Sequence, residues 1–179
     1  MNSYLILWSN DWCKKLEKMP DNGPIKVIYG GEHQSVPPLG KVMVGDMVYP
    51  VRINGGALYL LGRFEISAID DVELYLASQQ IEIPAGHLWD TGSEILIKEK
   101  PALGHLIPRN CVNHAAIGAG TALVYDRIVP VSIVEKLKLG PKGKEKLLPL
   151  KEGKVSHVNF QGHFRRLSEE SAEMVGGLI

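Results

Sequence analysis

Apolar residues recur along this chain in short runs that glycine and proline interrupt, a pattern typical of strands and turns. The two clearest runs, 42–53 and 57–69, flank Asn54-Gly55-Gly56, and these turn residues accept the positive φ angles of a tight hairpin. Gly62 in the second run predicts the bend or bulge that curls a small sheet. Further strands are predicted at 4–8, 25–29, 94–97, 103–112, 122–125 and 155–164.

Short helices are predicted between these strands. Ser9 or Asn10 can cap one that ends by Pro20, because either side chain can accept a hydrogen bond from the first turn. Asp70 and Glu73 form a capping box for a second helix over 70–79. The remaining helices are predicted at 130–139, with proline at its start, and at 168–178, with Ser168 as its cap.

These elements predict an α+β fold in which a small curled β-barrel or sheet is flanked by short helices and followed by a C-terminal elaboration. The chain has 179 residues and is 45% apolar, which suffices for a buried core and fits one domain. We expect a single domain over 1–179, with a core at about 1–130 and a basic elaboration at about 131–179.

Charge is divided unevenly along the chain, although the formal net charge is zero. Residues 65–99 carry eight acids and one lysine, net −7, whereas residues 136–166 carry nine bases and two acids, net +7. A basic final third favours a surface that faces a polyanion; the other reading is a solvated, charged loop. Two distant cysteines, no signal peptide and no apolar run of membrane length predict a cytoplasmic protein with reduced thiols.

Several segments within residues 4–69 together resemble the EVE branch of the PUA-like superfamily. The segments are 4–12, 25–29, 33–39, 44–49 and 61–64, and they include His33, Gly45-Asp46 and Gly62. The resemblance implies a pocket beside an incomplete barrel that holds a nucleobase, often a modified one, between aromatic rings. From about Pro101 the chain is similar to uncharacterised bacterial proteins with an Arg-Arg-Leu-Ser-x-Glu-Ser-Ala helix, which implies no function.

Candidate binding residues follow from the resemblance and from the available aromatic and cationic side chains. The base-binding candidates are Ser9, Asn10, Trp12, Tyr29, His33, Tyr49 and Trp89. The phosphate-binding candidates are Lys138, Lys142, Lys144, Lys146, Arg165 and Arg166. Trp8 ends an apolar strand and is expected in the core. The chain departs from the family at Val51-Arg52, which follows Pro50 in place of a polar strand exit.

Patterns for other chemistry are incomplete. Cys111 and His114, with His105 upstream, resemble half of a zinc site, but a second ligand pair at metal spacing is missing. Cys111 could also be a nucleophile if the fold brought a histidine beside it. Residues 118–121 resemble a phosphate loop without its lysine and are predicted to form a turn between strands. The sequence therefore predicts no metal, cofactor or catalytic residue.

The sequence favours a non-catalytic module that binds DNA or RNA, with a modified or flipped base in an aromatic pocket. An alternative is a protein-interaction module, such as an antitoxin, immunity or phage-defence accessory protein, that presents the acidic stretch 65–99 to a basic partner. A third hypothesis is a small enzyme that uses Cys111 or the histidines. No membrane partner is expected.

Overall fold

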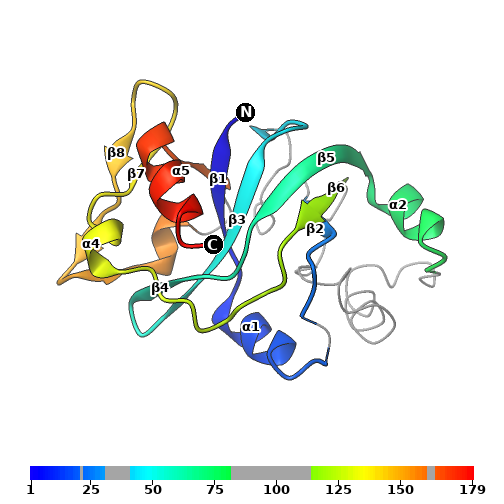
Figure 1. Cartoon of the computed structure of the whole chain (residues 1–179), viewed down its shortest axis with the longest axis horizontal. Helices are drawn as coiled ribbons and strands as arrows, with labels where there is room; N and C mark the ends of the chain where they lie inside the picture. Colours follow the sequence, from blue (N-terminus) through cyan, green and yellow to red (C-terminus); the bar gives the residue numbers. More distant parts are fainter. Residues whose placement is uncertain (21, 31–40, 82–113, 161–163) are drawn as a thin grey trace.

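The computed structural model describes residues 1–20, 22–30, 41–81, 114–160 and 164–179. Its main sheet has the strand order β11-β1-β3-β5-β6-β2, and β4 pairs with β3 outside this path (Figure 1). The strands are β1 Ser3–Leu7, β2 Val27–Gly30, β3 Met47–Asn54, β4 Ala57–Leu60, β5 Phe64–Asp71, β6 His114–Gly120, β7 Lys138–Leu139, β8 Lys146–Leu147, β9 Leu150–Lys151, β10 Lys154–Val155 and β11 Phe164–Arg166. The helices are α1 Asn10–Leu16, α2 Val72–Ser78, α4 Val131–Val134 and α5 Glu169–Gly176, with a 3₁₀ helix at His157–Asn159.

Strand β1 lies inside the sheet, between β3 and β11. It runs parallel to β3, and the other described pairs of the main sheet are antiparallel. A parallel pair needs a crossover connection, which residues 8–46 provide. On its other side β1 pairs with β11 in the register Tyr4↔Arg166. The C-terminal segment thus supplies a strand to the same sheet as the N-terminal segment.

The predicted hairpin turn is confirmed, but the strand expected at 42–53 begins only at Met47. The strand expected at 57–69 is divided into β4 and β5. Asn54 pairs with Ala57, so the turn between β3 and β4 has two residues, Gly55 and Gly56, with φ angles of +60° and +84°. Positive φ at both central residues is the geometry that matches the twist of the flanking strands. The predicted bend at Gly62 is also confirmed, because β4 ends at Leu60 and β5 begins at Phe64.

The glycines of residues 118–121 lie in strand β6, so the predicted turn there is wrong. The β5–β6 register shifts between Ile66 and Ala68, which brings the β5 backbone close to β6. A Cβ on Gly118 would overlap the Glu65 carbonyl group, and one on Gly120 would lie 2.7 Å from the Arg63 carbonyl oxygen. These glycines therefore permit a close approach of two strands.

Two helix predictions and one strand prediction need correction. Asp71, rather than Asp70, caps α2, because its Oδ1 accepts hydrogen bonds from the backbone N–H groups of Glu73 and Leu74 at 2.8 and 3.1 Å. The helix expected at 130–139 is shortened to α4, since Lys138–Leu139 pairs with β8. The strand expected at 155–164 is replaced by a 3₁₀ helix and the start of β11. Ser9 and Ser168 are confirmed as caps.

Three more strand predictions meet different outcomes. Residues 122–125 follow β6 without strand pairing, so the strand expected there is wrong. The strands expected at 94–97 and 103–112 lie outside the described residues.

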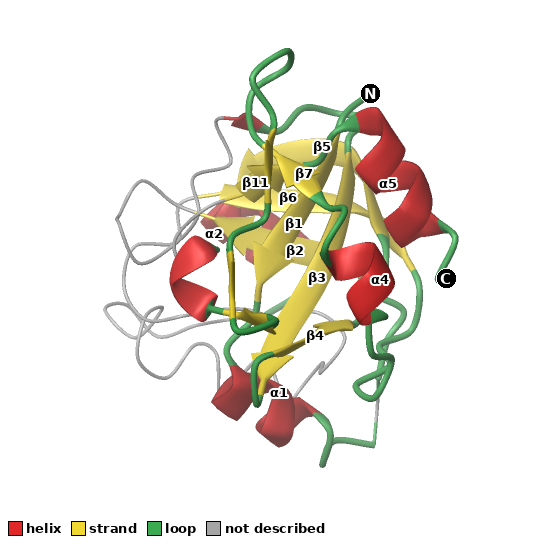
Figure 2. Ribbon diagram, turned by 90° about the vertical axis from the view of Figure 1, so that its left-hand side faces the viewer, coloured by secondary structure: helices red, strands yellow, loops and turns green. Residues whose placement is uncertain are grey.

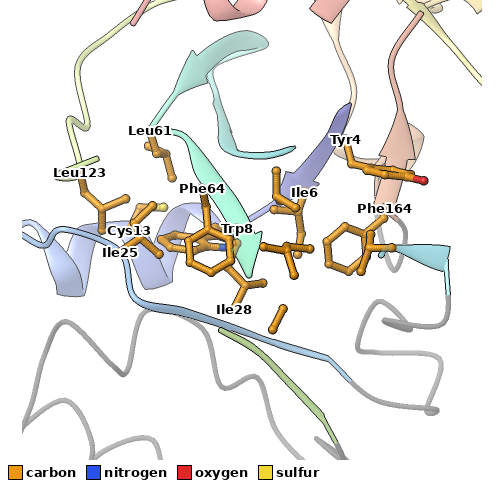
Figure 3. Close-up of a cluster of buried hydrophobic side chains, with 14 of the residues drawn as sticks. Tyr4, Ile6, Trp8, Cys13, Ile25, Ile28, Leu61, Phe64, Leu123 and Phe164 are labelled. Atoms are coloured by element: carbon orange, nitrogen blue, oxygen red, sulfur yellow. The ribbon is translucent and has the colours of Figure 1, made fainter. Parts of the chain in front are cut away.

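All six strands of the main path send apolar side chains into one cluster, the inner core. Ile28 on β2 and Phe164 on β11 both belong to it, although their strands are at opposite ends of the path. Figure 3 shows Trp8 and Phe64 together in this cluster, and the predicted burial of Trp8 is confirmed. A sheet whose two ends contribute to one core is curled around it.

The other face of the sheet is covered in two places. Over β1, β3 and β4, an outer core joins Leu5, Tyr49 and Leu60 to Val134 of α4 and Val175 of α5. At the β2–β6 end, a third cluster packs the sheet against α2. Figure 2 shows α4 and α5 along one side of the molecule and α1 at its lower end. The predicted α+β class with a curled sheet and short flanking helices is confirmed.

Among the described helices, none is long and apolar enough to cross a membrane.

Candidate functional site

Helix α1 begins where β1 leaves the sheet, and its first turn carries three of the predicted base contacts. The Ser9 hydroxyl accepts a hydrogen bond from the backbone N–H of Trp12 at 3.2 Å. Asn10 donates from Nδ2 to Oδ1 of Asn54, 3.4 Å away, which links the helix start to the β3–β4 turn. Trp12 is half-buried and packs against the inner core. The structure therefore brings Ser9, Asn10 and Trp12 to one end of the sheet.

Arg52 belongs to the Val51-Arg52 pair at which the sequence departs from the EVE resemblance, and it is only 7% exposed. Its Nη2 donates to the Glu17 carboxylate of α1's C-terminal cap at 3.1 Å and to the Tyr125 carbonyl oxygen at 2.6 Å. The guanidinium carbon lies 5.2 Å from the ring centroid of Tyr59 and 5.8 Å from that of Tyr125. Cation–π contacts of this kind stabilise a buried cation and restrict its orientation.

Four buried polar side-chain atoms, on α1, on β3 and in segment 125–127, have no hydrogen-bond partner within the described residues. They are Oδ1 of Asn10, Nε of Arg52, the hydroxyl oxygen of Tyr125 and Nη1 of Arg127. Proteins pair nearly all of their buried polar atoms, so an unpaired group indicates a place for water or a ligand. We call Asn10, Glu17, Arg52, Tyr59, Tyr125 and Arg127 the Arg52 cluster.

The Arg52 cluster draws its residues from several segments of the chain. Asn54, which contacts Asn10, lies two residues after Arg52 and thus on the same face of β3. Arg52 and Tyr59 are paired across β3 and β4. Arg127 is held next to Tyr59, because its carbonyl oxygen accepts a hydrogen bond from the Leu60 N–H at 2.9 Å.

The electrostatics of the Arg52 cluster favour an electron-rich ligand. It contains two guanidinium groups and one carboxylate, that of Glu17. Burial raises the pKa of the neighbouring Cys13 thiol to about 12, and the charge of Arg52 opposes this shift only in part. Burial also raises the pKa of the Tyr125 hydroxyl. Both groups are neutral at physiological pH, so the positive charge of the cluster is in excess.

Tyr29 and Tyr49, two other predicted base contacts, do not meet Trp12. Tyr29 is fully buried in the cluster beneath α2, with its ring 6.4 Å from that of Tyr75. Tyr49 is buried in the outer core, where a Cβ on Gly176 of α5 would lie 3.1 Å from its hydroxyl oxygen. Both clusters are on the opposite face of the sheet from the inner core. These rings therefore form no cage with Trp12.

His33 and Trp89, the remaining predicted base contacts, lie outside the described residues.

Two of the predicted phosphate-binding lysines pair with helix α5. Lys138 Nζ lies 3.4 Å from the Glu170 carboxylate, and Lys142 Nζ lies 3.9 Å from that of Glu169. All four of these side chains are exposed, so the pairs are weak. Lys144 and Lys146 are also exposed and have no ion pair within the described ranges.

The two predicted phosphate-binding arginines make internal hydrogen bonds. Arg165 donates from Nε to the Asn159 carbonyl oxygen at 2.6 Å. Arg166 donates from Nε to the Asn2 side chain at 3.1 Å, and from Nη1 to the Glu145 carboxylate at 2.9 Å and to the Gly140 carbonyl at 3.3 Å. Both arginines thus join parts of the C-terminal third, and Arg166 also binds the N-terminal segment.

The lysine-rich β7–β8 hairpin and the start of α1 lie at different ends of the molecule in both overall views (Figures 1 and 2). A different lysine lies beside the β3–β4 turn. The Val155 N–H donates to the Gly56 carbonyl oxygen at 2.8 Å, and a Cβ on Gly56 would lie 2.8 Å from the Cβ of Lys154. Lys154 therefore covers the turn that Asn10 contacts through Asn54.

Within the part of the chain that the structure describes, no three potential metal ligands gather at one point. His114 lies in β6, opposite Gly30 of β2 and Asp71 of β5. The other members of the half zinc site, His105 and Cys111, lie outside the described residues.

The sequence marks Arg52 only as part of a departure from the resemblance, and it does not indicate Tyr59, Tyr125 or Arg127. A signal existed, because an arginine inside an apolar strand pattern needs buried partners. Those partners come from segments that are distant in the sequence, so the sequence did not identify them.

Comparisons with known proteins assign no family. No family model matches the sequence, and no curated protein matches it. Among solved structures, the fold is similar to crystal structures of two point mutants of ZmASCH from Zymomonas mobilis. Their sequences are 10% and 11% identical to this chain, with TM-scores of 0.35 and 0.33. The matches cover 86% and 85% of this chain and 94% and 91% of those chains, and similarity at this level identifies no function.

Proposed function

We propose that this chain is a PUA-like, EVE-type module that binds DNA or RNA and holds one unpaired or flipped base at the start of α1. The observation that carries the proposal is the contact of Asn10 with Asn54, which joins the predicted base contacts to the turn that Lys154 covers. An aromatic ring, amide groups and a cation at one surface are the groups that a single-stranded nucleic acid needs. The module itself performs no chemistry.

Fluorescence polarisation at low salt tests the proposal. Labelled single- and double-stranded DNA and RNA of one length and mixed sequence are titrated with the protein. We expect single strands to bind more tightly than duplexes, with an affinity that falls as salt rises, because phosphate contacts release counterions. Absence of binding to all four probes contradicts the proposal.

Trp12 variants locate the base. Trp12→Ala is expected to weaken binding about 5- to 100-fold, since one stacked base contributes about 1–3 kcal/mol. Trp12→Phe, which keeps a ring, is expected to recover most of the affinity. Thermal unfolding of both variants is the control, because Trp12 also packs against the inner core. Equal affinities for the wild type and a folded Trp12→Ala protein place the base elsewhere.

Lysine variants locate the phosphate path. Lys154→Gln is expected to reduce the slope of log affinity against log salt by about one. Lys26→Gln, an exposed lysine at the start of β2, is the matched control and leaves the slope unchanged. If instead Lys144→Gln and Lys146→Gln reduce the slope and Lys154→Gln does not, the nucleic acid follows the β7–β8 hairpin.

A further inference from the structure

The unpaired atoms of the Arg52 cluster differ in what they can bind. Nε of Arg52 and Nη1 of Arg127 are donors only, because a guanidinium group has no acceptor. Oδ1 of Asn10 is an acceptor only, and the Tyr125 hydroxyl can be either. A ligand that pairs with all four atoms must therefore present at least two acceptors and at least one donor, either an N–H or an O–H group.

The orientation of these atoms is fixed by contacts inside the protein. The Glu17 carboxylate and the Tyr125 carbonyl oxygen hold Nη2 of Arg52, and two rings lie near its guanidinium plane. Asn54 holds Nδ2 of Asn10, and Oδ1 of Asn10 is buried with no partner among the described residues. Donors held this way cost little ordering entropy when a ligand binds.

The Arg52 cluster also reaches the surface. Asn10, Tyr59 and Arg127 are half-buried, whereas Arg52 beneath them is 7% exposed. A planar ligand that enters beside the Tyr59 ring can thus meet aromatic surface and hydrogen-bonding groups together. Asn10 is also one of the predicted base contacts at the start of α1. The Arg52 cluster therefore shares a residue with the proposed nucleic-acid surface.

We propose that the Arg52 cluster reads the edge of the bound base and selects bases that present a ring N–H next to a carbonyl oxygen, guanine and uracil (or thymine), over adenine and cytosine. This inference rests on the proposed function. Arginine donors favour carbonyl oxygens, as in the common contact of arginine with guanine O6 and N7. Guanine and uracil also carry a ring N–H beside a carbonyl, which supplies the donor for Asn10 Oδ1.

Mononucleotides test the selectivity directly. The 5′-monophosphates of guanosine, uridine, adenosine and cytidine are titrated into the full chain, and binding is followed by NMR chemical shifts. We expect the guanosine or the uridine nucleotide to bind about tenfold more tightly than the adenosine and cytidine nucleotides. Equal affinities for all four nucleotides overturn the inference.

Variants connect the preference to the Arg52 cluster. Arg52→Met and Arg127→Gln are each expected to reduce the tenfold preference to about twofold or less, and Tyr125→Phe to weaken binding of the preferred nucleotide. Arg63→Gln, which removes an exposed arginine between β4 and β5, is the matched control and keeps the preference. A preference that survives in folded Arg52→Met and Arg127→Gln proteins shows that other residues read the base.

The two proposals fail in different ways. In one outcome, oligonucleotides bind, but both the wild type and Arg52→Met bind oligo(U) and oligo(A) of one length with equal affinity. The Arg52 cluster then does not read the base, and the proposed function stands. If no nucleic acid binds in any form, both proposals fail.

Discussion

Arg52 and Arg166 lie on strands of one sheet, with side chains that are 8% and 15% exposed, yet they are paired differently. Arg166 uses Nε and Nη1 for hydrogen bonds to Asn2, Gly140 and Glu145. Arg52 uses Nη2 for both of its hydrogen bonds, and its Nε has no partner among the described residues. Burial alone therefore does not distinguish a structural arginine from one that still has an unpaired donor. The hydrogen-bond partners of each guanidinium nitrogen make this distinction.

The largest expected effect is the loss of stability in Arg166→Met. This change removes three charged hydrogen bonds and leaves the Asn2 and Gly140 acceptors unpaired, for a loss of about 2–3 kcal/mol in the free energy of unfolding. Thermal unfolding should shift down by roughly 5–10 °C, with nucleic-acid affinity unchanged in the folded protein. A reduced affinity at a temperature where the variant is folded would place Arg166 in the binding surface, as the sequence predicted.

Arg52→Met is expected to cost less stability, about 1–2 kcal/mol. The substitution breaks two hydrogen bonds and two ring contacts and leaves the Tyr125 carbonyl oxygen without this donor, but it also removes a buried Nε that has no partner. Chemical denaturation of the two methionine variants side by side measures the difference. If both variants lose the same free energy of unfolding, Arg52 stabilises the fold as much as Arg166 does, and the proposed difference between the two arginines is wrong.

The smallest expected effect is the pH dependence of the Arg166 region. The backbone N–H of Glu145, and after it the Arg166 guanidinium, hold the pKa of the Glu145 carboxyl below its usual value. A carboxyl with a lowered pKa in the folded state adds stability above its unfolded pKa of about 4.5, and this stability is lost as pH falls through the folded value.

Melting temperatures measured from pH 7 to pH 3 test whether stability is lost on acidification as expected. The wild type should lose more stability on acidification below about pH 4.5 than Glu145→Gln, which has no carboxyl to protonate. Glu135→Gln, at an exposed residue after α4, is the control and should follow the wild type. If the melting temperatures of all three proteins fall in parallel as the pH is lowered, the pKa of the Glu145 carboxyl is not lowered in the folded state.

The parts of the fold that the sequence predicted correctly are those with a local cause. The two-residue turn after Asn54 follows from the φ angles that Gly55 and Gly56 accept, and the caps Ser9 and Ser168 from side chains that reach their own first turn. The sequence predicts a turn, wrongly, for the glycines of β6, because the reason for these glycines is not local. Gly118 is required by Glu65 on the neighbouring strand, which the sequence alone does not place there.

The distinction between local and distant causes also explains which residues of the candidate site the sequence predicts. Ser9, Asn10 and Trp12 follow one another along the chain, and the structure keeps them together at the start of α1. Arg52 obtains its main acceptor from Tyr125, 73 residues away, so its environment could not be read from its neighbours. Tyr49 was predicted as a base contact by its place in a strand motif, but the alternation of β3 turns it toward α5.

The hydrogen bond from Arg166 to Asn2 joins residues 164 apart in the sequence, and the pairing of β1 with β11 spans a similar distance. During translation, β1 is therefore made long before the strand that completes its pairing. Contacts of such sequence separation slow folding, and the unpaired edge of β1 can meanwhile associate with other chains. The yield of folded protein should consequently depend on chaperones and on temperature during expression, independently of how stable the finished fold is.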